Sequence, residues 1–193
     1  MIERSHAALL AAVLAASLLS SACVPLIVAG AAGTALVATD RRSVGAQADD
    51  TAIELNIGQH ASARFGDRAH ISTTSYNGIV LLSGEVPDQA SRDYMTEYAR
   101  SVARVRSVQN ELVVAPPSEL GSRSNDTYLT SVVKTRFLEG KDTFSATHVK
   151  VVTDRRVVYL MGLVRRNEDE AASRIAASTG GVERVVKVFE YLD

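Results

Sequence analysis

The chain has 193 residues and a formal net charge of −1, so its overall charge gives no bias toward nucleic acid. Aromatic residues make up 5% of the chain and Trp is absent, which excludes the aromatic-rich basic surface of a single-strand nucleic-acid binder. The single cysteine, Cys23, excludes an internal disulfide framework. The length allows one medium domain or two small ones.

The first 22 residues have the features of a secretory signal. Arg4 gives a weak positive charge, Ala7 to Leu19 form an apolar run, and the small residues 20–22 precede Cys23. This segment resembles a bacterial lipoprotein signal, with Ser20 at the position where that pattern prefers Leu. The resemblance implies cleavage before Cys23 and acylation of its sulfur and amine.

Residues 23–48 are therefore predicted to be a lipidated N-terminus and linker, with acyl chains on Cys23 and no other cofactor. Val24 after the cysteine implies, by the same resemblance, passage to the outer membrane and a periplasmic body. Two alternatives remain. An uncleaved apolar helix from Ala7 to Ala38 is long enough to span a bilayer, and an ordinary cleaved signal would leave no anchor.

From residue 49 the chain repeats itself after about 77 residues, a sign of duplicated structure. DDTAIELNI matches NDTYLTSVV, GIVLLSGEV matches RVVYLMGLV, and VRSVQNELVV matches VERVVKVFEY. The segment between the copies contains Pro and Gly, which interrupt regular elements. We predict a first domain at 49–115, a linker at 116–124 and a second domain at 125–193.

Each copy has the pattern helix, strand, strand, helix, strand. Asp49 and Asp50 are expected to cap the first helix, and Ile53, Ile57 and Ala61 to form its buried face. The fold class is predicted to be α+β, with two helices packed on a three-stranded mixed sheet in each copy.

Turn residues indicate a β-hairpin in each copy, at Asn77-Gly78 and at Asp154-Arg155. The second helices are expected at about 88–102 and 168–178, each followed by the closing strand. The first helix of the second copy is expected to begin near Asp126.

The doubled pattern resembles the BON domain family, and specifically the dual-BON outer-membrane lipoproteins. The motif residues are Val80, Leu82, Gly84, Val86, Val105, Val108 and Asn110 in the first copy, and Val158, Leu160, Gly162, Val164, Val182 and Val185 in the second. Lys187 replaces the asparagine in the second copy. The resemblance implies a non-enzymatic protein that binds phospholipid, supports envelope integrity and is linked to division sites and outer-membrane protein assembly.

The first helix of the second copy is more apolar than its counterpart. Tyr128 replaces Ala52, and Val132 replaces Asn56, when the two helices are aligned. Leu138 replaces Ser62 and lies roughly 80° around the helix from Tyr128. An apolar helix with basic neighbours suits a lipid interface, since its cations can approach anionic headgroups.

The predicted phospholipid-binding residues all belong to this helix. They are Tyr128, Leu129, Val132, Lys134, Arg136, Phe137 and Leu138. Leu129 and Phe137 align with core positions of the first copy, and are expected to be core as well as part of this set. The alternative is that the extra apolar surface packs on the first copy, or docks another envelope protein, which would make the chain a protein-interaction adaptor.

Motifs for catalysis and metal binding are missing. His6, His60, His70 and His148 lie in separate elements without ligand spacing, and no nucleophile elbow or phosphate-binding loop is present. The acidic run at 168–170 is interpreted as a helix start. Arg155 and Arg156 are interpreted as a solvated turn rather than a phosphate contact.

Overall fold

The computed structural model describes residues 40–140 and 144–193, which belong to one compact unit of the chain. The signal, Cys23 and the possible Ala7–Ala38 helix lie outside the described residues. Within the described residues, no helix combines the length and apolarity that a bilayer crossing requires.

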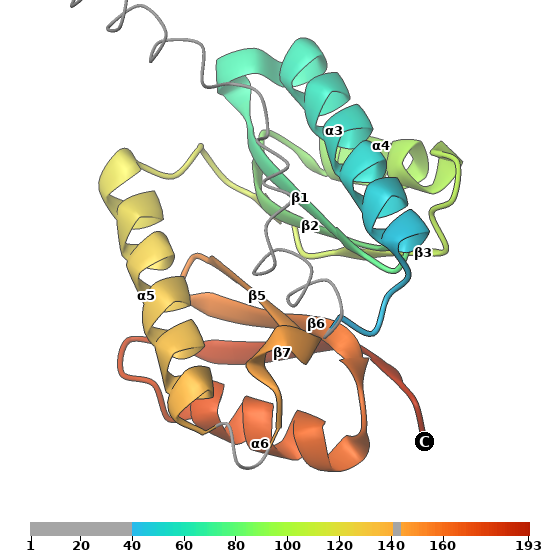
Figure 1. Ribbon diagram of the computed structural model, residues 1–193. Coiled ribbons are helices and arrows are strands. Elements are labelled where there is room, and N and C mark those ends of the chain that lie inside the picture. Colours follow the sequence, from blue (N-terminus) through green and yellow to red (C-terminus); the bar gives the residue numbers. More distant parts are fainter. Residues whose placement is uncertain (1–39, 141–143) are drawn as a thin grey trace, which may run out of the picture. The chain divides into compact units, whose positions relative to one another are not determined.

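The first copy is an α+β domain with its helices on one face of a mixed sheet (Figure 1). Strands β1 and β2 pair antiparallel, and β3 and β4 each pair parallel with β2. The elements are α3 (Val44–Phe65), η1 (Gly66–Arg68), β1 (His70–Tyr76), β2 (Ile79–Val86), α4 (Gln89–Ser101), β3 (Ser107–Asn110) and β4 (Val113–Val114).

The closing strand of this copy is split because Asn110 interrupts it. The Asn110 side chain accepts a hydrogen bond from the Leu112 N–H (2.9 Å) and donates to the Arg92 carbonyl (3.0 Å). Strand β3 therefore ends at Asn110 and β4 begins at Val113, and each of them pairs with β2.

The second copy repeats the arrangement with an unbroken closing strand. Strand β6 lies between β5, which is antiparallel to it, and β7, which is parallel. The elements are α5 (Leu120–Glu139), η2 (Ala146–His148), β5 (Val149–Asp154), β6 (Val157–Val164), α6 (Arg166–Ala177) and β7 (Arg184–Tyr191). The predicted α+β fold with mixed sheets is confirmed.

Three predicted boundaries are wrong. Helix α3 begins at Val44, capped by the Ser43 hydroxyl, so Asp49 and Asp50 lie inside the helix. Helix α5 begins at Leu120, within the stretch predicted as linker. The second hairpin turns at Arg155-Arg156, one residue later than predicted, with positive φ at both residues.

The middle strands β2 and β6 are buried on both faces, and the motif side chains of β2 all lie on one of those faces. Val80, Leu82 and Val86 join the cluster formed with α3 and α4. The residues between them face the other way, where Leu81 joins a separate cluster. Near-continuous apolar runs are expected of strands buried on both faces.

That separate cluster joins the two copies. It contains Tyr76 and Leu81 of the first copy and Tyr159 and Met161 of the second, all buried. Polar contacts accompany it: Ser83 donates to Asp154 across the junction (3.1 Å). The copies therefore pack sheet against sheet.

The residues just before α3 are attached to both copies. Arg41 donates to Glu168 (2.6 Å) and to the Leu163 carbonyl (2.8 Å), both in the second copy. Arg42 donates to Asp50 of the first copy (2.8 Å), and its guanidinium lies 4.0 Å from the centre of the Tyr76 ring. The last part of the predicted linker is thus folded onto the body from residue 40.

Candidate membrane-contact helix and adjoining cavities

Helix α5 exposes large apolar side chains, as predicted for part of the set. Tyr128 is 65% exposed and Leu138 is 64% exposed, while Val132 is partly buried between them. Leu120, at the start of the helix, is also exposed. This outer face is where a lipid or protein surface can be contacted.

Two predicted contact residues belong to the core instead. Leu129 is 2% exposed and Phe137 is 1% exposed. Phe137 packs edge-on against Phe144, with ring centres 5.0 Å apart. The prediction of lipid contact must be corrected at both positions, because the apolar face that contains them covers the second sheet.

The two basic residues of the predicted set have different surroundings. Arg136 donates to the Thr179 hydroxyl (2.8 Å), a contact that ties α5 to the segment after α6. Lys134 is exposed, and no acceptor or carboxylate of the described residues pairs with its ammonium group. Lys134 is therefore the cation of this helix available to a ligand, and Arg136 has a packing role.

The polar residues of the outer face are hydrogen-bonded within the helix. Ser124, Thr127, Ser131 and Thr135 each donate to the carbonyl four residues earlier, at 2.9 to 3.0 Å. A polar group that keeps its hydrogen bond costs less to remove from water than an unpaired one. The outer face is thus easier to dehydrate than its Ser and Thr content suggests.

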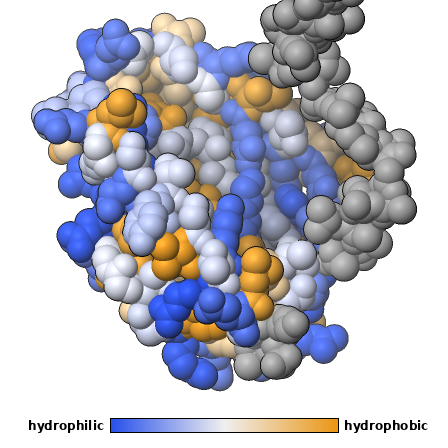
Figure 2. Space-filling view, turned by 60° about the vertical axis from the view of Figure 1, so that its left-hand side comes forward, coloured by the Kyte–Doolittle hydropathy of each residue, from blue (hydrophilic) through white to orange (hydrophobic). Residues whose placement is uncertain are grey.

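Figure 2 shows the side of the molecule on which this helix comes forward. Hydrophobic residues, in orange, are separated by pale residues of weak polarity and by blue charged ones. The surface is therefore mixed in character, as expected of a helix lying at an interface rather than in a bilayer core.

The alternative of packing on the first copy does not hold for this helix. The junction between the copies is formed by the sheet faces, through Tyr76, Leu81, Tyr159 and Met161. Tyr128 and Leu138 remain exposed. The extra apolar side chains of α5 are thus left for another surface.

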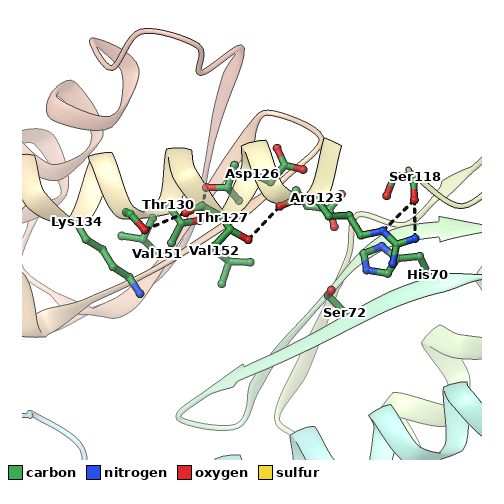
Figure 3. A pocket seen from close by; sticks show the side chains of 13 residues that line it. His70, Ser72, Ser118, Arg123, Asp126, Thr127, Thr130, Lys134, Val151 and Val152 are labelled. Carbon is green, nitrogen blue, oxygen red and sulfur yellow. Dashed lines mark hydrogen bonds between the residues drawn. The ribbon is translucent and has the colours of Figure 1, made fainter. Parts of the chain in front are cut away.

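Two cavities lie along the seam between α5 and β5. The first, of about 410 Å³, is lined mostly by polar residues together with Val151 and Val152, and is called the polar cavity here. Figure 3 shows Lys134 at one end of it and Arg123, Ser118 and His70 at the other. The second, of about 240 Å³, is lined by Lys134, Phe137, Leu138, Ala146, Thr147 and Val149. Lys134 lines both cavities.

The carboxylates beside the polar cavity already have partners. Asp126 accepts the backbone N–H groups of Arg155 and Arg156 (both 2.9 Å), and Asp154 accepts the Ser83 hydroxyl. Burial, together with the nearby Glu85 carboxylate, raises the pKa of Asp154. These groups hold the turn and the junction in place.

At the other end of the second copy, Glu168 is held as a carboxylate. Burial alone would raise its pKa, but hydrogen bonds from Arg41, the Arg165 backbone and His148 lower the pKa to about 2. Glu168 also closes a capping box at the start of α6, as the interpretation of the acidic run implied.

The cavities could not be predicted from the sequence, because they depend on how α5 lies over β5. The hydroxyl pattern was available in the sequence: residues 127, 131 and 135 are Ser or Thr at a spacing of four. Within residues 40–140 and 144–193, no group of three His, Cys, Asp or Glu side chains could hold a metal ion.

Comparison with known proteins gives one family and several relatives. The BON domain family matches residues 49–116 and 125–193. The outer membrane lipoprotein DolP of Haemophilus influenzae is 38% identical over 187 residues, covering 95% of this chain and 96% of that protein.

Two further relatives are more distant. The 21 kDa hemolysin of Actinobacillus pleuropneumoniae is 31% identical, covering 79% of each chain. The osmotically-inducible protein Y of Escherichia coli K12 is also 31% identical, covering 77% of this chain and 76% of that protein.

Proposed function

Because the chain belongs to the BON domain family, and is a non-enzymatic outer-membrane lipoprotein by its similarity to such a protein, we propose that α5 attaches it reversibly to anionic phospholipid. Acyl chains on Cys23 supply the first attachment in this proposal. The outer face of α5 supplies the second, and together they support envelope integrity.

The observation that carries this proposal is the exposed, easily dehydrated face of α5. Tyr128 and Leu138 are too exposed to contribute to the core. Shallow burial of either side chain in a lipid interface contributes about 1 kcal/mol, and a lysine near an anionic surface about 1 kcal/mol more. Together, these contributions amount to weak binding by α5 alone.

Weak binding suffices when the chain is already anchored. A tethered site has an effective ligand concentration in roughly the millimolar range, so a second contact forms without high intrinsic affinity. Reversible contact also leaves the same helix face available to other envelope components.

Vesicle flotation tests the proposal with residues 23–193 carrying Cys23→Ala, so that no acyl chain contributes. We expect flotation with vesicles containing phosphatidylglycerol, weaker flotation with phosphatidylcholine alone, and loss of flotation in Leu138→Glu. Leu55→Glu is the matched control, because Leu55 on α3 is 58% exposed.

The outcome also separates the adaptor function. If the protein fails to float on any vesicle, the lipid proposal is wrong. Loss of a defined envelope protein partner in Leu138→Glu, without any vesicle binding, would instead assign this face of α5 to protein docking.

A further inference from the structure

We infer that the seam between α5 and β5 binds a single phospholipid molecule, with the phosphate at Lys134, the headgroup in the polar cavity and part of one acyl chain in the apolar cavity. This inference rests on the proposed function and deepens it. Adsorption to a membrane surface needs no cavity, whereas this site recognises one molecule.

The polarity of the lining residues changes along the seam. On α5 the seam runs from Arg123 and Thr130 through Lys134 to Leu138. On β5 the seam runs in the opposite direction along the strand, with Asp154 at the polar end and Val149 at the apolar end. The residues of α5 and those of β5 thus place the polar end of the seam at the same side.

The seam is long enough to hold an extended amphipathic molecule. Arg123 and Leu138 are fifteen residues apart on one helix, which is roughly 22 Å along its axis. An amphipathic molecule that extends across the whole seam must place its charge part-way along it. Lys134 provides the cation at that place, and lines both cavities.

The charges of α5 along the seam are well separated. Asp126 lies eight residues before Lys134, or roughly 12 Å along the helix, and its carboxylate is occupied by the turn. A phosphate at Lys134 is therefore separated from this carboxylate. The polar cavity is lined between them by the hydroxyls of Thr127, Thr130 and Ser131, whose oxygens can accept hydrogen bonds from a headgroup.

The lining of the smaller cavity suits an acyl chain. Phe137, Leu138, Ala146 and Val149 present carbon atoms, and Thr147 and the stem of Lys134 complete the wall. Leu138, an exposed residue of the outer face proposed to meet the membrane, forms part of this wall. A chain entering from the lipid therefore reaches it without crossing the polar cavity.

The test uses lysophosphatidylglycerol with acyl chains of six, eight and ten carbons, below the micelle concentration, and isothermal titration of residues 23–193 with Cys23→Ala. We expect saturable binding to one site, with affinity rising about fourfold for each added methylene until the cavity is filled. Glycerol phosphate tests the headgroup without the chain.

Two variants assign the parts of the site. Ala146→Leu is expected to fill the apolar cavity and abolish the chain-length dependence, while Ala177→Leu, an exposed alanine at the end of α6, is its control. Lys134→Gln is expected to weaken binding about tenfold, with an unchanged melting temperature. Because Lys134 is exposed, this variant keeps the test valid if Ala146→Leu does not fold.

Absence of saturable binding by any of the three lysolipids, together with intact vesicle flotation, overturns the single-molecule site and leaves the proposed function standing. Equal affinity for glycerol phosphate and the lysolipids overturns the acyl assignment. Loss of both flotation and lysolipid binding in the parent protein overturns the proposed function as well.

Discussion

Asp50 and Asp126 occupy the same place in the two copies, each holding the turn of its own hairpin from a neighbouring helix. Asp50 accepts the N–H groups of Asn77 (2.7 Å) and Gly78 (2.8 Å). Asp126 accepts those of Arg155 and Arg156, both at 2.9 Å. The carboxylate thus fixes the first helix of each copy to the hairpin that follows it.

Removing this contact is expected to destabilise the protein. Asp126→Ala leaves two backbone N–H groups without their acceptor, and hydrogen bonds to a charged group contribute about 1.5–3 kcal/mol each. We expect a loss of about 3 kcal/mol in urea unfolding. Asp67→Ala, at an exposed aspartate in η1, is the control and should change stability by less than about 0.5 kcal/mol.

The glycines of the middle strands are expected to resist substitution. A Cβ atom at Gly84 would overlap the His70 carbonyl oxygen, and one at Gly162 would overlap that of His148. Gly84→Ala should cost about 3 kcal/mol by forcing strands apart. Gly58→Ala should instead stabilise α3 by about 0.5–1 kcal/mol, since no atom lies within 4 Å of its added Cβ. Similar effects at both sites would contradict this account.

The contribution of Asp154 to folding stability should change with pH in the direction opposite to that of most carboxylates. Burial and Glu85 raise its pKa above the unfolded value of 3.8, so the folded state holds a proton more tightly. Its contribution to stability is present at low pH and lost as pH rises through the folded pKa. Asp154→Asn should therefore melt higher than the parent at pH 7, with the difference shrinking near pH 4. A melting temperature of Asp154→Asn below that of the parent at pH 7 would refute this prediction.

The contribution of Glu168 to folding stability should change with pH in the direction usual for a carboxylate. Its pKa is lowered from 4.5 to about 2, so its stabilising contribution is present above pH 4.5 and lost as pH falls toward 2. Glu168→Gln is expected to lower the melting temperature at pH 7 and to match the parent near pH 2. Thermal melts of both proteins between pH 2 and pH 7 measure the effect. A difference in melting temperature that stays constant over this pH range would contradict the prediction.

The anchor can be tested apart from the helix. Cys23→Ala in the full chain should abolish incorporation of labelled fatty acid and reduce membrane association in cell fractionation. Residual association should then depend on Leu138, because the face of α5 is the second attachment. Unchanged association without label in Cys23→Ala/Leu138→Glu would exclude both attachments.

The two hairpin turns show what sequence alone could predict. Asn77-Gly78 was predicted correctly because these residues adopt positive φ readily, as two-residue hairpin turns require. Arg155-Arg156 was missed because arginine gives no such signal. The turn forms there because Asp126, distant in sequence, supplies the acceptor for both N–H groups.

The candidate site was predictable only in part. Exposure of Tyr128 and Leu138 followed from comparing the two copies, since their counterparts are small or polar. The role of Arg136 depends on Thr179, which a helical pattern cannot place. The early start of α5 was hidden by a Pro-, Gly- and Ser-rich stretch, in which Arg123 donates to the Ser118 carbonyl (2.6 Å).

The sheet faces that meet at Leu81 and Met161 make the repeat interdependent. Either half expressed alone would present a bare aromatic and aliphatic surface to water, and would be prone to self-association. Covering that surface thus requires both copies, and fusion in one chain keeps the second sheet always at hand.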